Sequence, residues 1–153
     1  MLRRADASRA MAVGALAVVC MATSSACRSS SSDGPAALRV EVDGATRAWK
    51  LVDIEALPTQ DVTLDGSVYK GVSLTRLLPA PLAPEESVVA RGADGSTQTL
   101  PYAAASRPEC LVAHGKDGRS LSAAEGPLRI VLVDSPGLSV RNLVNLRVEK
   151  ARN

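Results

Sequence analysis

Residues 69–78 read Tyr69-Lys-Gly-Val-Ser-Leu-Thr-Arg-Leu-Leu78 and carry the sharpest change of pattern in this chain of 153 residues. An aromatic residue and a Gly-Val pair come first, and a leucine-rich run follows directly. Ser73 stands where a hydroxyl side chain can cap the first turn of a helix. Pro79 cannot continue that helix, because it has no backbone N–H. The segment therefore predicts a short helix over residues 73–78.

Short segments with their own periodicity lie on both sides of this helix. Residues 38–43 alternate apolar and charged side chains, as a half-buried strand does. Residues 48–57 place apolar side chains at helical spacing and stop at Pro58. Further strands are predicted at residues 61–64, 87–91, 97–100, 109–114, 128–133 and 142–149. These elements indicate an α+β domain that is mainly β, with mixed sheets and two or three short helices.

Four Asp-Gly pairs begin at residues 43, 65, 94 and 117 of this domain. Their spacings of 22, 29 and 23 residues are irregular, and no ladder of acidic residues surrounds them as in a calcium-binding loop. Asp-Gly is a favoured pair in tight hairpin turns, which need a positive φ. We therefore predict that these pairs are turns between strands.

The N-terminal segment has the features of a secretory signal. Basic residues precede the apolar run of residues 10–22, which is too short to span a bilayer as a helix. Small residues before Cys27 resemble the bacterial lipobox, although Ser24 stands where Leu, Val or Ile is usual. Ordinary signal-peptidase cleavage before Cys27 is the alternative. We predict a signal peptide at 1–26 and lipid attachment at Cys27.

The predicted tether and the predicted cellular location follow from this cleavage. Residues 28–37 are rich in Ser and polar residues, so 27–37 form the lipidated cysteine and a flexible tether, with the domain at 38–150. We expect an extracytoplasmic lipoprotein anchored in a membrane. Arg28 stands where inner-membrane lipoproteins carry Asp, which favours the outer membrane.

Charge and cysteine content exclude several kinds of partner. Removal of the signal takes three of the 18 basic residues and one of the 16 acidic residues, so the mature part has a formal net charge of zero. No basic cluster or aromatic series is present for binding nucleic acid. Cys110 is flanked by apolar residues and is predicted to be buried. Cys110 and His114 supply only two of the four ligands of a tetrahedral zinc site.

Four segments, in order, resemble the molybdopterin-binding domain of the sulfite oxidase family. The resemblance covers about residues 38–149. The four segments are the YKGVSLTRLL run at 69–78, the strand and Asp-Gly turn at 88–95 with Leu100-Pro101, the LVAHGKDGRSL run at 111–121, and EGPLRIVL at 125–132. The resemblance implies a sulfite-oxidase-type fold and a pterin-containing cofactor.

Two departures from the family pattern bear on activity. Catalytic members ligate molybdenum with a cysteine upstream of the first segment, whereas residues 38–69 contain no cysteine. Glu125 stands where the family has a histidine, so an acid replaces a group that could face an anionic cofactor. The chain is also about half as long as the catalytic enzymes. We therefore expect no molybdenum and no catalytic residue.

Three residues are candidates for contact with a cofactor. Arg129 matches the arginine of the last segment and could hold a phosphate or the polar edge of a pterin, or form an ion pair with Glu109 or Asp134. His114 could contact a ligand, or end a strand with its ring bonded to backbone. Tyr69 could stack on a flat ring, or fill the core.

Three functional hypotheses follow. The first is a membrane-anchored, non-catalytic binding module for a pterin-like small molecule, a periplasmic or membrane protein partner, or both. The second is a molybdopterin-dependent oxidoreductase subunit, whose metal is held by the pterin alone. The third is a lipoprotein that binds no ligand and makes only protein contacts.

Overall fold

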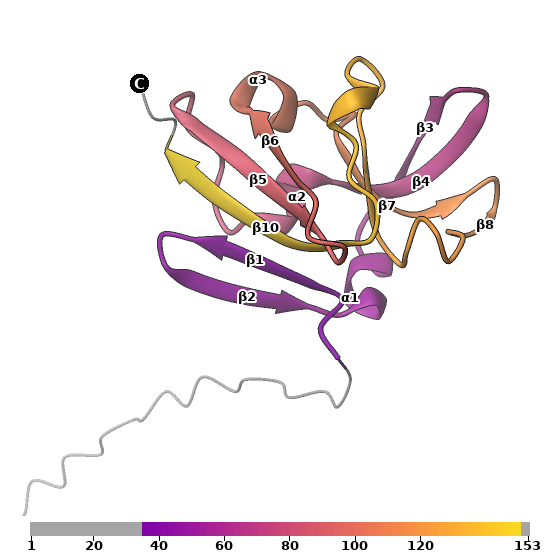
Figure 1. The fold of residues 1–153 in the computed structure, drawn as a ribbon, viewed down its shortest axis with the longest axis horizontal. Coiled ribbons are helices and arrows are strands. Elements are labelled where there is room, and N and C mark those ends of the chain that lie inside the picture. The colour runs from indigo at the N-terminus through magenta and orange to yellow at the C-terminus, as the bar shows by residue number, and fades with distance from the viewer. Residues whose placement is uncertain (1–34, 151–153) are drawn as a thin grey trace, which may run out of the picture. The chain divides into compact units, whose positions relative to one another are not determined.

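Two β-sheets and three short α-helices form residues 35–150, the part of the chain that the computed structural model describes (Figure 1). The first sheet has the strand order β2-β1-β10-β5-β6 and is mixed, because β1 and β10 run parallel. The second sheet has the order β3-β4-β7-β8, and β9 also pairs with β7. The class predicted from the sequence, α+β and mainly β, is confirmed.

The bounds of the elements are as follows. The first sheet contains β1 (Leu38–Val42), β2 (Ala45–Trp49), β5 (Glu86–Gly92), β6 (Thr97–Pro101) and β10 (Leu143–Lys150). The second contains β3 (Gln60–Leu64), β4 (Ser67–Ser73), β7 (Leu111–Lys116), β8 (Arg119–Ser120) and β9 (Arg129–Val131). The helices are α1 (Leu51–Glu55), α2 (Leu74–Leu77), α3 (Tyr102–Ala105) and the 3₁₀ helix η1 (Pro136–Leu138). The predicted signal peptide, Cys27 and residues 28–34 of the tether lie outside the described residues.

Each Asp-Gly pair is a turn between consecutive strands, as predicted. In three of them both residues have a positive φ, for example 49° at Asp43 and 80° at Gly44, which suits the twist of a two-residue hairpin. The fourth turn differs, because the carboxylate of Asp94 accepts hydrogen bonds from the backbone N (2.9 Å) and Oγ (2.6 Å) of Ser96. Asp94 therefore forms its turn.

Gly71 of the opening segment lies close against the backbone of β7. A Cβ atom at Gly71 would lie 2.6 Å from the Cα of Ala113, so only glycine fits. The register of the two strands shifts between Lys70 and Gly71, which leaves His114 as an extra, bulged residue in β7. The bulge places Tyr69 directly opposite Lys116.

Two helix predictions need correction. The helix predicted at 73–78 spans only Leu74–Leu77. Ser73 is its N-cap residue, as predicted, but its side chain makes no capping hydrogen bond to the helix, and its Oγ lies 3.1 Å from the Oγ1 of Thr75. The helix predicted at 48–57 spans only Leu51–Glu55. Its first two residues belong to β2, which pairs with β1 and had not been predicted. The short α3, β8 and η1 were also missed.

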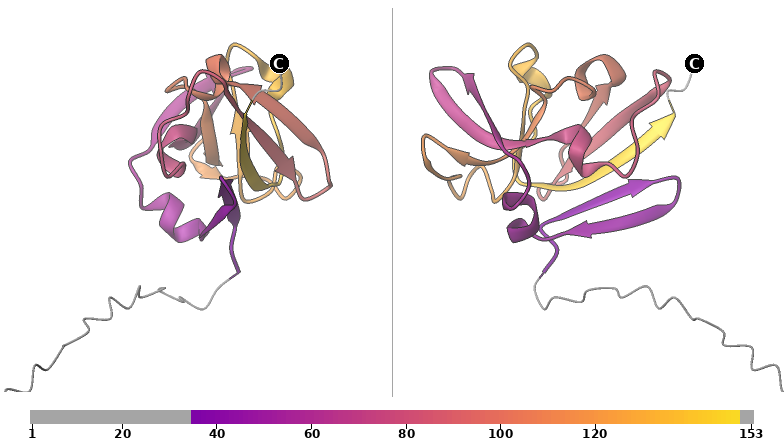
Figure 2. Two further views of the ribbon diagram at one scale, coloured as in Figure 1. Left: turned by 90° about the vertical axis from the view of Figure 1, so that its left-hand side faces the viewer. Right: turned by 180° about the vertical axis from the view of Figure 1, so that it is seen from behind.

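The main hydrophobic core takes side chains from both sheets. Figure 2 shows the ribbons of these sheets from two further directions. Leu38 and Leu146 of the first sheet and Val112 and Ile130 of the second are fully buried in it. Each such leucine or isoleucine contributes about 1.5–3 kcal/mol on burial. Cys110 is buried as predicted. Within residues 35–150, no helix has the length and hydropathy that crossing a membrane would require.

Candidate functional site

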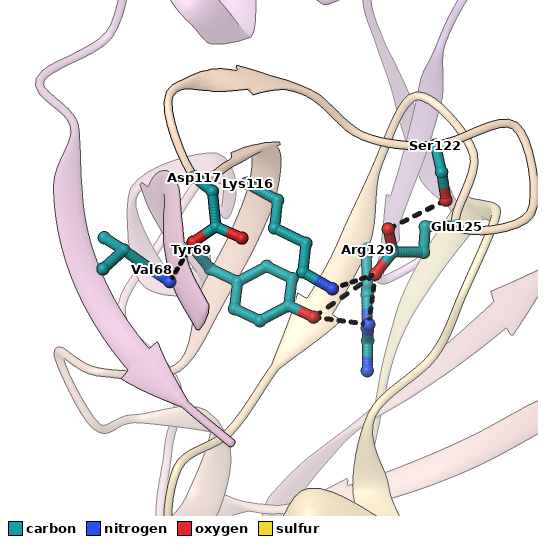
Figure 3. A network of polar contacts seen from close by, with 7 residues as sticks. All are labelled: Val68, Tyr69, Lys116, Asp117, Ser122, Glu125 and Arg129. Carbon is teal, nitrogen blue, oxygen red and sulfur yellow. Dashed lines mark hydrogen bonds and ion pairs between the residues drawn. The ribbon is translucent and has the colours of Figure 1, made fainter. Parts of the chain in front are cut away.

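Five polar side chains meet on the second sheet beside the loop that precedes β9 (Figure 3). We call this group, Tyr69, Lys116, Ser122, Glu125 and Arg129, the Glu125 cluster. Tyr69 and Lys116 are cross-strand partners. Arg129 pairs with Ala113, which pairs with Gly71, so the side chains of Arg129 and Tyr69 lie on the same face of the sheet. The cluster therefore joins three strands and one loop.

The carboxylate of Glu125 is the common acceptor of the cluster. Its Oε1 accepts hydrogen bonds from Arg129 Nη1 at 2.6 Å and from the Tyr69 hydroxyl at 3.3 Å. Its Oε2 accepts one from Ser122 Oγ at 2.9 Å, and Lys116 Nζ lies 3.7 Å from Oε1. Arg129 Nη1 also donates to the Tyr69 oxygen at 2.9 Å. The side chains of Glu125 and Arg129 are each 12% exposed, so this is a buried ion pair.

The loop that carries Glu125 is held in place by its backbone. The N–H groups of Glu125 and Gly126 both donate to the carbonyl of Ser122, and Asn142 donates its N–H to the carbonyl of Glu125 at 2.8 Å. Gly126 has a φ of 77°, and a Cβ there would lie 2.7 Å from the Cα of Asn142. The glycine of the EGPLR segment thus lets the loop pack against the start of β10.

The surroundings change the pKa values of two members of the cluster. Burial by itself would raise the pKa of Glu125, but hydrogen bonds from Ser122 and Arg129 and the charge of Lys116 outweigh it and lower the pKa. A hydrogen bond with Tyr69 is the largest cause that raises the pKa of Lys116. Glu125 is therefore ionised at neutral pH, and its charge neutralises Arg129.

Arg129 is consequently not an open anion-binding group. The sequence left open an ion pair for Arg129 with Glu109 or Asp134, and the structure gives it a different carboxylate, that of Glu125. Asp134 pairs instead with Arg107. Lys116, whose side chain is 33% exposed, supplies the one positive charge of the cluster that its carboxylate does not balance. A single shielded ammonium is a weak site for a phosphate.

Tyr69 lies in the protein interior, at 4% exposure, and packs in a small second cluster of buried apolar side chains. The centre of the Arg129 guanidinium lies 5.1 Å from the centroid of its ring, and Lys116 Nζ lies 5.2 Å from it. The ring therefore fills the core and contacts cations of the Glu125 cluster. Stacking of a ligand on this ring would require those cations to move.

His114 lies apart from the other two candidates. It lines a different hollow with Glu55, Asp61 and Lys70, which Lys116 of the Glu125 cluster also borders. Lys70 points to the opposite face of β4 from Tyr69. Its Nδ1 is 4.0 Å from Glu55 Oε1, and its Nε2 is buried without a hydrogen-bond partner within residues 35–150. The expected bond to backbone is therefore absent there. Burial is the largest cause that lowers the pKa of His114, so its ring is neutral at pH 7.

A pocket of about 410 Å³ lies beside α3. Figure 1 shows the helix α3 next to β6. We call it the α3 pocket. Arg107 donates from Nε to the carbonyl of Ala103 at 3.2 Å and forms an ion pair with Asp134, so one cation and one carboxylate stand together in its wall. The pocket is lined by Pro101, Ala103, Ala104, Arg107, Glu109, Cys110, Leu132, Val133, Asp134, Ser135 and Leu138.

The residues of the α3 pocket were not recognised in the sequence. Arg107 and Asp134 are 27 residues apart, and neither belongs to a motif. Helix α3 itself has only four residues, Tyr102–Ala105, too few to leave a helical pattern. The apolar residues around Cys110 indicated burial, which is correct, but not that this buried thiol also borders a pocket.

Comparison with known proteins finds no protein-family model that matches the chain, and no curated protein that matches it. Within the described part of the chain, no three His, Cys, Asp or Glu side chains gather closely enough to hold a metal ion.

Proposed function

We propose that this chain is a membrane-tethered, extracytoplasmic binding module of the sulfite-oxidase-type fold. It holds a flat, pterin-like ligand in the α3 pocket and performs no redox chemistry itself. The lipid on Cys27 keeps the domain at the membrane, where a periplasmic or membrane protein binds it and responds to whether the ligand is bound. The observation that carries the proposal is the α3 pocket, which combines a concave apolar wall with one adjacent donor and acceptor pair.

The dimensions and chemistry of the α3 pocket suit such a ligand. Its volume of about 410 Å³ falls within the range typical of small-molecule sites. Leu132 and Leu138 offer apolar surface to the faces of a ring. The Asp134 carboxylate can accept N–H groups from the edge of an aminopyrimidinone, while the guanidinium of Arg107 donates to its carbonyl. A pterin presents these groups side by side.

The Glu125 cluster supports the same choice of pocket. A cofactor phosphate at Arg129 would have to displace Glu125, whose carboxylate lies 2.6 Å from the guanidinium. Separating the two would leave a buried charge without a partner, which costs about 3–5 kcal/mol. Arg107 is more exposed, at 50% for its side chain, and its partner Asp134 is 71% exposed. An exposed pair opens to a ligand at little cost.

Cys110 supports the non-catalytic part of the proposal. It is the one cysteine of residues 38–150, and burial raises the pKa of its thiol to about 12. A thiol must lose its proton to ligate a metal, and this environment opposes that loss. The thiol therefore serves as an apolar part of the pocket wall.

The test fills the α3 pocket without disturbing the core. Ala103 is exposed and lines the pocket, so Ala103→Trp should occupy the ligand volume. Ala45→Trp places the same side chain on an exposed residue of β2 as the control. The lipoprotein and both variants are extracted from membranes in detergent and titrated with pterins by fluorescence, and any compound released on denaturation is identified by mass.

The expected result is pterin binding that Ala103→Trp abolishes and Ala45→Trp preserves. Loss of binding in Arg129→Ala with full binding in Ala103→Trp would move the ligand to the Glu125 cluster and refute the α3 pocket. A chain that releases no compound and binds no pterin would refute the small-molecule function and favour a lipoprotein that makes only protein contacts. Stoichiometric molybdenum in the purified protein would overturn the non-catalytic assignment.

A further inference from the structure

The outer face of the first sheet carries a row of polar side chains across three adjacent strands. Asn145 of β10 pairs on one side with Arg39 of β1 and on the other with Arg91 of β5. The neighbouring residues Leu38 and Ala90 are fully buried in the core. Because side chains alternate along a strand, the three polar residues share the face that points away from the core. We call them the arginine row.

The arginine row lies in a shallow hollow of about 640 Å³. Arg39, Arg91, Arg147 and Asn145 line it, together with Val144, which is 37% exposed. Val144 sits at a register shift between Leu143 and Asn145, where the extra residue bends β10. The hollow therefore combines guanidinium groups with the carboxylate residue Glu41 and a small apolar contact.

Charge on this face is unevenly distributed along the strands. Arg147 is paired with Glu149 at 2.6 Å, and Glu41 accepts a hydrogen bond from the Asn145 amide at 2.8 Å. Arg39 and Arg91 have no ion-pair partner within residues 35–150. Neighbouring strands lie about 4.8 Å apart, so two long side chains on either side of Asn145 can converge on one phosphate group.

The uncompensated end of this face is the end at which the tether joins the domain. Ala36, near the start of the described residues, lines the same hollow as Arg39. Eight residues lie between Cys27 and Ala36, and the nine steps along the chain from one to the other can span about 30 Å at most. A lipid at Cys27 thus keeps the arginine row within reach of the membrane surface.

We infer that the arginine row binds the phosphate of an anionic phospholipid headgroup and lays this face of the domain on the membrane. The inference rests on the proposed lipid anchor. A single lipid chain gives only reversible attachment, and basic residues near the anchor supply the second contact that makes it stable. Each arginine near an anionic surface is expected to raise vesicle affinity about fivefold.

The test separates the arginine row from the anchor. The full chain with Cys27→Ser, which carries no lipid, is mixed at low salt with vesicles of phosphatidylglycerol and phosphatidylcholine, or of phosphatidylcholine alone. Flotation measures the bound fraction. One double variant combines Arg39→Gln and Arg91→Gln, and the control double variant combines Arg76→Gln and Arg119→Gln. The control pair removes the same charge from exposed residues of α2 and β8.

We expect the chain to float with the anionic vesicles and not with phosphatidylcholine alone. The arginine-row variant should reduce the affinity for anionic vesicles about 25-fold, and the control variant less than about threefold. Equal losses in the two double variants would show a net-charge effect and overturn the inference. Displacement from the vesicles by millimolar inorganic phosphate would identify a soluble phosphate compound as the ligand and overturn the assignment to lipid. Membrane fractionation of the chain with native Cys27 tests the lipid anchor separately. A failure of the anchor proposal can therefore be distinguished from a failure of the arginine-row inference.

Discussion

Arg129 of the second sheet and the pair Arg39 and Arg91 of the first sheet occupy opposite electrostatic surroundings. Arg129 on the second sheet is buried against Glu125 and the Tyr69 hydroxyl, and its charge is neutralised within the protein. Arg39 and Arg91 on the first sheet are exposed and have no carboxylate within ion-pair distance among the described residues. The comparison teaches that a nearby carboxylate, rather than the motif around an arginine, decides whether its guanidinium is free for a ligand.

The largest expected effect is on stability when Arg129 is removed. Arg129→Ala leaves Glu125 in the interior without its main partner, so we expect the free energy of unfolding to fall by about 3 kcal/mol. Arg91→Ala should change it by less than about 0.5 kcal/mol, because Arg91 is exposed. Urea unfolding at pH 7 measures both. Equal losses in the two variants would mean that Arg129 is not held in a buried pair.

A smaller effect is expected in the dependence of stability on pH. The pKa of Glu125 is lowered from its ordinary 4.5, so the folded state favours the carboxylate. Its contribution is complete above about pH 4.5 and is lost as the pH falls through the folded-state pKa. We expect the stability difference between the native chain and Glu125→Gln to shrink as the pH falls from 7 to 3. Ser122, Arg129, Lys116 and Tyr69 are the polar groups that face this carboxylate.

The control for this measurement is Glu85→Gln, an exposed carboxylate in the loop before β5. The change with pH in Glu125→Gln is compared with the change in this surface variant. A difference for Glu125→Gln that grows as the pH falls would require a raised pKa. The carboxylate would then be a destabilised buried acid, and Arg129 would be available to a ligand.

The sequence was sufficient for the Asp-Gly turns and for most strands, but not for β2, β8 or the partner of Arg129. Alternation at 38–43 and the Asp-Gly pairs are local signals, and each is found where predicted. Strand β2 was missed because Ala45–Trp49 is exposed along most of its length and lacks apolar alternation. Its pairing with β1 is a tertiary effect that overrides the helical spacing of residues 48–57.

The candidate site was predicted only in part for a similar reason. Tyr69 and Arg129 lie in motifs and do meet, but the third candidate, His114, points into another hollow. The bulge opposite Gly71 sets the direction of His114, and no local pattern in β7 reveals it. Glu125 was recognised as a departure from a family pattern. Its role as the partner of Arg129 depends on the loop held by Gly126, which only the tertiary structure defines.

The smallest expected effect concerns Lys116, at the edge of the Glu125 cluster. Its ammonium lies 3.7 Å from Glu125 and its side chain is one-third exposed, so solvent weakens the pair. Because Arg129, Tyr69 and Ser122 already satisfy the carboxylate, Lys116→Met should lower the free energy of unfolding by less than about 1 kcal/mol. The matched control is Lys70→Met, because Lys70 follows Tyr69 in β4. A loss from Lys116→Met as large as that from Arg129→Ala would make the ammonium the principal counter-ion, and the guanidinium of Arg129 would then be as free for an anion as those of Arg39 and Arg91.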